Sequence, residues 1–97
     1  PEGDRRILRE LAKKYLEKSL SVEVTKNDFL NMGHICWCMN DKPAAIEYYR
    51  KSLRTSGMDL EWFAKTIMED SSQLIRLGIH GFDIPLMIDY IMMSAVR

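Results

Sequence analysis

Residues 25–57 decide the fold, and they read TKNDFLNMGHICWCMNDKPAAIEYYRKSLRTSG. Apolar residues recur every three or four positions on both sides of Asn40-Asp41, as on one face of a helix. Thr25 followed by Asp28 is typical of a helix start, as is Asp41 followed by Pro43, and Gly57 is typical of a helix end. The pattern therefore predicts two helices joined by a tight turn. The residues that carry it are Phe29, Leu30, Met32, Ile35, Cys36, Trp37, Met39, Ala44, Ala45, Ile46, Tyr48, Tyr49 and Leu53.

Small residues lie inside both predicted helices. Gly33 lacks a side chain, and Ala45 and Ser52 are small, so a neighbouring helix can approach closely at each of them. Tyr49 is large enough to fill the space between them. We therefore expect the two helices of this hairpin to touch at these positions.

The flanking segments also carry helical patterns. Residues 4–20 have an apolar stripe opposite a charged face. A longer stripe over residues 59–78 predicts one helix ended by Gly78, with Asp59 or Ser56 as its cap. Asp83 begins a last helix. The sequence thus predicts an all-α chain of five helices in antiparallel pairs.

An internal repeat connects the first segment with the hairpin. Residues 15–20 match residues 48–53 at an offset of 33, and Ala12 falls on Ala45 at the same offset. Within the hairpin, the spacing of the large, small and aromatic positions resembles a tetratricopeptide repeat (TPR). The residues at matching spacings are Phe29, Met32, Gly33, Ala45, Tyr49 and Ser52, while Cys36 stands where that family has an aromatic residue.

The resemblance is clear over residues 26–57 only. It implies a single helical-repeat domain over 1–97, a short TPR-like superhelix of stacked hairpins. Residues 4–20 would then be the second helix of a truncated repeat, and 59–96 a diverged helix pair. Since the chain begins at Pro1, we expect a fragment of a larger, bacterial-type protein.

The same resemblance implies a protein-interaction scaffold that binds a peptide or a partner helix and catalyses nothing. In that family the first helix of each repeat lines a groove. Carried over by position, the groove residues here are Asn27, Leu30, His34, Trp37 and Cys38. The alternative, that a neighbouring helix covers Trp37, remains open.

The last predicted helix is apolar on most sides, with Asp89 as its one charge between residues 86 and 93. A repeat array normally ends with a polar cap, so this helix needs cover. It either packs on residues 60–75 or acts as a capping and self-association element that forms a homodimer. The self-association residues would be Leu86, Met87, Tyr90, Ile91 and Met93.

Composition argues against several function classes. The net charge of zero disfavours nucleic acid as a partner. Residues 1–54 hold eleven Lys/Arg and eight Asp/Glu, a balance of +3, and residues 55–97 a balance of −3, which could favour head-to-tail contacts. No apolar run is long enough to span a membrane. Cys36 and Cys38 point to different helix faces and cannot pair, so we expect reduced thiols and a cytoplasmic protein.

Catalytic and metal chemistry find little support in the sequence. His34 and Cys38 share a helix face, but two ligands are too few for a structural zinc, and only the distant His80 could add a third. A metal or redox site there is the remotest alternative. Glu69 and Asp70 face different directions as neighbours and suit a solvated face. We therefore expect no metal, no cofactor and no enzymatic activity.

Overall fold

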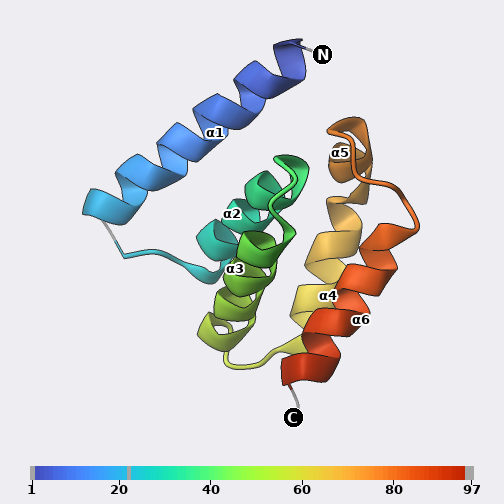
Figure 1. Ribbon diagram of the computed structural model, residues 1–97. Helices are drawn as coiled ribbons and strands as arrows, with labels where there is room; N and C mark the ends of the chain where they lie inside the picture. The colour runs from blue at the N-terminus through green and yellow to red at the C-terminus, as the bar shows by residue number, and fades with distance from the viewer. Residues whose placement is uncertain (1, 22, 96–97) are drawn as a thin grey trace.

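The computed structural model describes residues 2–21 and 23–95, and it describes their side chains except at 2–4, 15 and 18–21. This described chain consists of six helices and contains no strand. The all-α prediction is confirmed (Figure 1). None of the described helices is long and apolar enough to cross a membrane. The helices are α1 (Glu2–Ser21), α2 (Lys26–Cys38), α3 (Lys42–Thr55), α4 (Leu60–Glu69), α5 (Ser71–Arg76) and α6 (Asp83–Ala95).

Helices α2 and α3 form the predicted hairpin, with the predicted caps. Thr25 and Asp28 cap α2 reciprocally, because each side chain bonds the backbone N–H of the other. The Asp41 carboxylate accepts from the N–H of Ala44 at 3.2 Å, which caps α3. Gly57, at φ +77°, ends α3, and the following N–H returns to the carbonyl of Leu53.

The small residues of the hairpin lie where helices touch, as predicted. A Cβ added to Gly33 would lie 2.5 Å from Cε1 of Tyr49, so α2 and α3 can approach this closely only at glycine. Ala45 and Ser52 are fully buried. The Ser52 hydroxyl donates to the carbonyl of Lys26 at 2.9 Å and ties the end of α3 to the start of α2.

The expectation of one helix over residues 59–78 is wrong, because that segment breaks at Asp70 into α4 and α5. Asp70 has φ −90° and ψ 3°, outside helical geometry. Its carboxylate binds His34 on α2, which holds the chain at the break. Gly78, at φ +109°, ends α5 as predicted, and the N–H of Ile79 bonds the carbonyl of Leu74.

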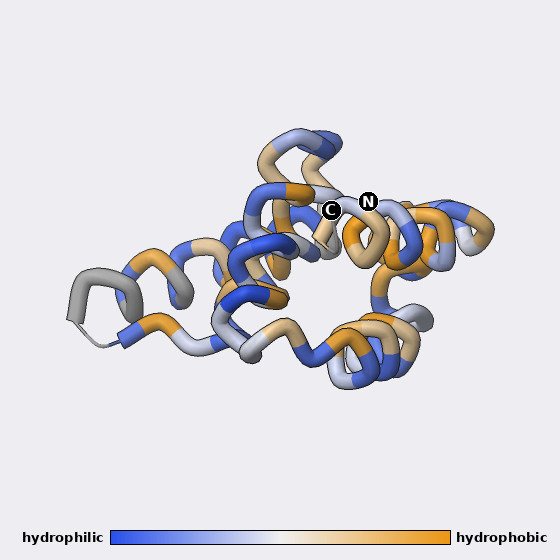
Figure 2. The backbone as a smooth tube through the Cα atoms, turned by 90° about the horizontal axis from the view of Figure 1, so that it is seen from below, coloured by the Kyte–Doolittle hydropathy of each residue, from blue (hydrophilic) through white to orange (hydrophobic). Residues whose placement is uncertain are grey.

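The α2–α3 hairpin lies in the middle of the molecule. Helix α1 lies on one side of it, and α4 and α6 lie on the other (Figure 1). Hydrophobic and hydrophilic segments alternate along the helices, so each helix can bury one face (Figure 2). The buried faces meet in one core formed by Leu30, Trp37, Ala45, Tyr49, Leu53, Phe63, Ile67, Leu74, Ile84, Met87, Ile88 and Ile91.

Candidate interaction site

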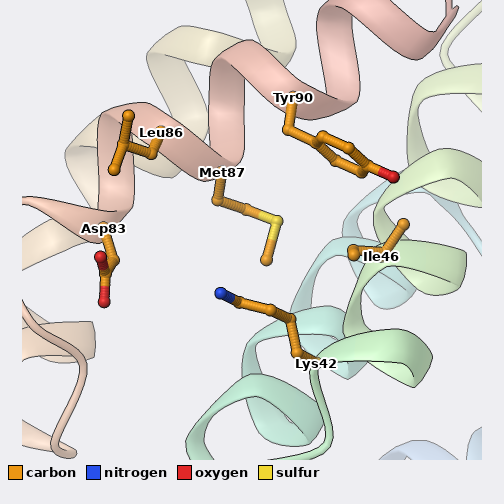
Figure 3. Close-up of a pocket in the computed structure, with 6 residues that line it drawn as sticks. All are labelled: Lys42, Ile46, Asp83, Leu86, Met87 and Tyr90. Carbon is orange, nitrogen blue, oxygen red and sulfur yellow. The ribbon is translucent and has the colours of Figure 1, made fainter.

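A groove lies between α3 and α6, with a volume of about 320 Å³. Its α3 wall carries Lys42 and Ile46, one helical turn apart. Its α6 wall carries Asp83, Leu86, Met87 and Tyr90 (Figure 3). We call this the α3–α6 groove. Its lining is mainly apolar, with one cation and one anion at the end where both helices begin.

The charged side chains leave the groove open. Lys42 extends its ammonium into the space between the helices (Figure 3), and the described part of the chain shows no ion pair between Lys42 and Asp83. Further along α3, the Arg50 guanidinium lies 5.8 Å from the centre of the Tyr90 ring. This cation–π contact helps to hold the ring over the groove. Helix α3 therefore contributes one cation to the groove lining, Lys42, and a second cation, Arg50, against the Tyr90 ring.

The predicted self-association residues of α6 form two sets, one buried and one exposed. Met87 and Ile91 are buried in the core, so they cannot serve as contacts for a second molecule without unfolding this one. Leu86, Tyr90 and Met93 are 64, 52 and 59% exposed. The helix thus packs on its own chain and also presents large apolar side chains to the outside.

The predicted groove on α2 is wrong for most of its residues. Leu30, His34 and Trp37 are buried, Cys38 is half-buried, and Asn27 is exposed. The alternative that neighbouring helices cover Trp37 is confirmed, because its ring packs edge-on against Tyr49 with centroids 6.2 Å apart. This face of α2 is part of the core and cannot be an open binding surface.

A polar network that the sequence analysis missed joins α2, α3 and the α4–α5 break. The Nδ1 atom of His34 lies 2.6 Å from the Tyr49 hydroxyl, and Nε2 lies 2.9 Å from Oδ2 of Asp70. The sequence analysis placed Asp70 on a solvated face. The structure instead places its carboxylate against His34. The run Asp70-Ser71-Ser72, three residues of low helix propensity, was the available signal for a break.

Tyrosine, histidine and aspartate are residue types that can relay protons, but a substrate could not reach the tyrosine of this network. Tyr49 is fully buried, and burial raises the pKa of its phenol well above the usual range. Both ring nitrogens of His34 are engaged, which argues against the metal alternative at His34 and Cys38. Burial also raises the pKa of the Cys38 thiol to about 11, and that of Cys36, which makes both poor nucleophiles at neutral pH.

Among the described residues, no three His, Cys, Asp or Glu side chains gather as metal ligands would. Every described buried side-chain nitrogen or oxygen has a hydrogen-bond partner. The network therefore has the form of a satisfied structural element that fixes α2, α3 and α5 relative to one another.

No family model, no curated protein and no solved structure matches this chain significantly. The function of this chain is therefore inferred from its own geometry.

Proposed function

We propose that this chain is a protein–protein interaction module that accepts an apolar helical segment of a partner protein in the α3–α6 groove. The observation that carries the proposal is the exposure of Leu86 and Tyr90, one helical turn apart, beside this groove. Exposed apolar side chains at a concave site are typical of helix-in-groove recognition. The TPR resemblance over residues 26–57 supports the same class of function.

The charges of the groove favour a particular kind of segment. Lys42 and Arg50 both lie on the α3 side of the groove, eight residues apart on one helix face. An amphipathic helix with an acidic residue beside its apolar row could pair with Lys42 while its apolar side chains cover Leu86 and Tyr90. We propose the cytoplasm as the compartment, which the two unpaired thiols favour.

A titration tests the groove directly. The probe is a synthetic amphipathic helix with leucines at i, i+4 and i+7 and glutamates beside them, added to ¹⁵N-labelled protein. We expect saturable NMR shifts centred on the amides of Ile46, Leu86 and Tyr90. A double variant, Leu86→Ser with Tyr90→Ser, should weaken binding more than about tenfold, as the loss of two central apolar contacts does.

The matched control is Ile75→Ser, which removes from α5 a side chain that is as exposed as Tyr90, at 52%. This variant should bind the probe like the unmodified protein. Shifts scattered over the whole surface, or equal affinity for the Leu86/Tyr90 variant, would show that the α3–α6 groove is not a binding site.

A second proposed function is self-association through α6, as a capping element. It is favoured by the exposure of Met93, which lies outside the α3–α6 groove lining, on the same side of α6 as Leu86 and Tyr90. Light scattering over a concentration series tests it. A chain that stays monomeric at millimolar concentration does not use α6 in this way.

A further inference from the structure

A hollow of about 230 Å³ lies where α1, α2 and α5 meet. Its floor is inside the fold, because half of the lining side chains are buried, and its rim opens to solvent between half-buried and exposed ones. Among the described residues, it shares none with the α3–α6 groove. We call it the α1–α5 hollow. Its floor consists of Leu8, His34, Ile35 and Leu74, and its rim of Leu11, Asn31, Gln73 and Leu77.

The described lining of the α1–α5 hollow is mainly apolar and contains no Asp, Glu, Lys or Arg. Leucine and isoleucine side chains from α1, α2 and α5 make up most of it. The ring of His34 has both nitrogens engaged already, by Tyr49 and by Asp70. An ionised ligand would lose its hydration here without gaining a counter-charge. A ligand that fits this hollow is therefore neutral.

Two amide groups at the rim can contact a ligand. The side chains of Asn31 and Gln73 make no hydrogen bond within the described part of the chain. Each amide offers an N–H donor and a carbonyl acceptor. A ligand whose apolar part lies on the floor can therefore place one polar group at the rim, where these amides receive it.

Water is a poor occupant of the floor. A buried water needs about two to four polar partners, and the described floor offers only the histidine ring that is already engaged. A space without atoms costs the lining side chains their van der Waals contacts, so an apolar molecule that fills it restores them. Since an apolar cavity of about 150 Å³ holds benzene, this hollow has room for roughly nine non-hydrogen atoms.

We propose that the α1–α5 hollow binds a small neutral molecule of this size, with an apolar ring and one N–H or hydroxyl group, of the indole or phenol class. Its ring lies against Leu8, Ile35 and Leu74, and its polar group bonds the amides of Asn31 and Gln73. Such a molecule contacts α1, α2 and α5 together, so binding also holds α1 against the rest of the chain. The proposal does not depend on a partner protein in the α3–α6 groove.

Three probes of equal size test the chemistry of the site. Indole is neutral and has an N–H, indene has nearly the same shape without a hydrogen-bonding group, and isoindoline is a cation at neutral pH. Each is titrated into the ¹⁵N-labelled unmodified protein and followed by NMR. We expect indole to saturate with a dissociation constant of about 0.1–1 mM, in the range for a ligand of its size. Indene should bind about fivefold more weakly, for want of the hydrogen bond. Isoindoline should bind more than about tenfold more weakly.

Variants of the protein test the location. Leu11→Phe enlarges a lining side chain and should weaken indole binding more than about tenfold, because the new ring and the ligand would overpack the space. The matched control is Ile7→Phe, at a position of α1 that is 50% exposed and outside the described lining, and it should bind indole like the unmodified protein. Asn31→Leu combined with Gln73→Met removes both amides, so this protein should bind indole and indene equally. Circular dichroism checks the fold of each variant.

The outcomes that would overturn the proposal are distinct. If indole does not saturate at millimolar concentration, the α1–α5 hollow is not a ligand site. If Leu11→Phe binds indole as tightly as Ile7→Phe does, indole binds elsewhere. If isoindoline or indene binds as tightly as indole, the ligand class is wrong. Should Leu11→Phe fail to fold, the Asn31/Gln73 variant decides, because a preference for indole over indene that persists in it places indole away from these amides.

Discussion

Replacing Gly33 with alanine tests the contact on which the hairpin depends. The new Cβ would lie 2.5 Å from Cε1 and 2.6 Å from Cδ1 of Tyr49, where ordinary contacts begin at 3.4 Å. The Tyr49 ring would have to move by about 1 Å. It is held edge-on between Trp37 and Phe63, and its hydroxyl lies 2.6 Å from Nδ1 of His34, so a shift of that size breaks the hydrogen bond.

The magnitude follows from three contributions. Overpacking a well-filled core costs roughly 1–3 kcal/mol. Loss of the buried hydrogen bond adds about 1 kcal/mol. The higher helix propensity of alanine returns about 1 kcal/mol. We expect a net destabilisation of about 2 kcal/mol, which for a domain of this size lowers the melting temperature by roughly 10 °C.

Urea and thermal denaturation followed by circular dichroism measure this effect. The control is Gly81→Ala, whose added Cβ meets only Cδ1 of Ile75, at an ordinary 3.6 Å, and should change stability by less than about 0.5 kcal/mol. In a Tyr49→Ala background, Gly33→Ala should no longer destabilise, because the ring that it strikes is absent. A Gly33→Ala protein as stable as the unmodified chain would refute the close approach of α2 and α3.

The other predictions concern polar groups. His34→Ala leaves the buried Tyr49 hydroxyl without a partner and should lower the free energy of unfolding, measured with urea, by about 3 kcal/mol. Asp70→Ala should lower it by less than about 1 kcal/mol, because water can replace this partly exposed carboxylate. Equal costs for the two variants would contradict the network. Ser52→Ala should cost about 1 kcal/mol in the same assay through the lost bond to the carbonyl of Lys26, and no change would show that bond to be unimportant. Because burial raises the pKa of Cys38 to about 11, its alkylation at pH 8 should be roughly a hundredfold slower in the folded Cys36→Ser protein than in urea, and should accelerate up to pH 11; equal rates would contradict the burial.

Local patterns in the sequence were sufficient to predict most of the fold. The helix ends at Thr25, Asp41, Gly57 and Gly78 depend on side chains and backbone angles within a few residues, so short stretches of sequence identify them. The close contact at Gly33 was also predictable, since a glycine within a helix needs a packing reason. These features require no knowledge of distant residues.

The break at Asp70 and the burial of the predicted α2 groove could not be obtained in this way. Both depend on pairs far apart in the sequence: Asp70 contacts His34, 36 residues away, and Trp37 is covered by Tyr49 of the next helix. An apolar stripe predicts that a helix face is covered, but not by which element. The position-by-position transfer from the TPR family assigned that face to a partner, whereas this chain covers it with its own side chains.

The break at Asp70 lies next to the place where α1, α2 and α5 meet. Directly after the break, Leu74 of α5 and the following Leu77 line the α1–α5 hollow of about 230 Å³ together with Leu8 and Leu11 of α1. His34 of α2 lines the same hollow and contacts Asp70, so one buried side chain joins the break to the place where α1 packs on the rest of the chain.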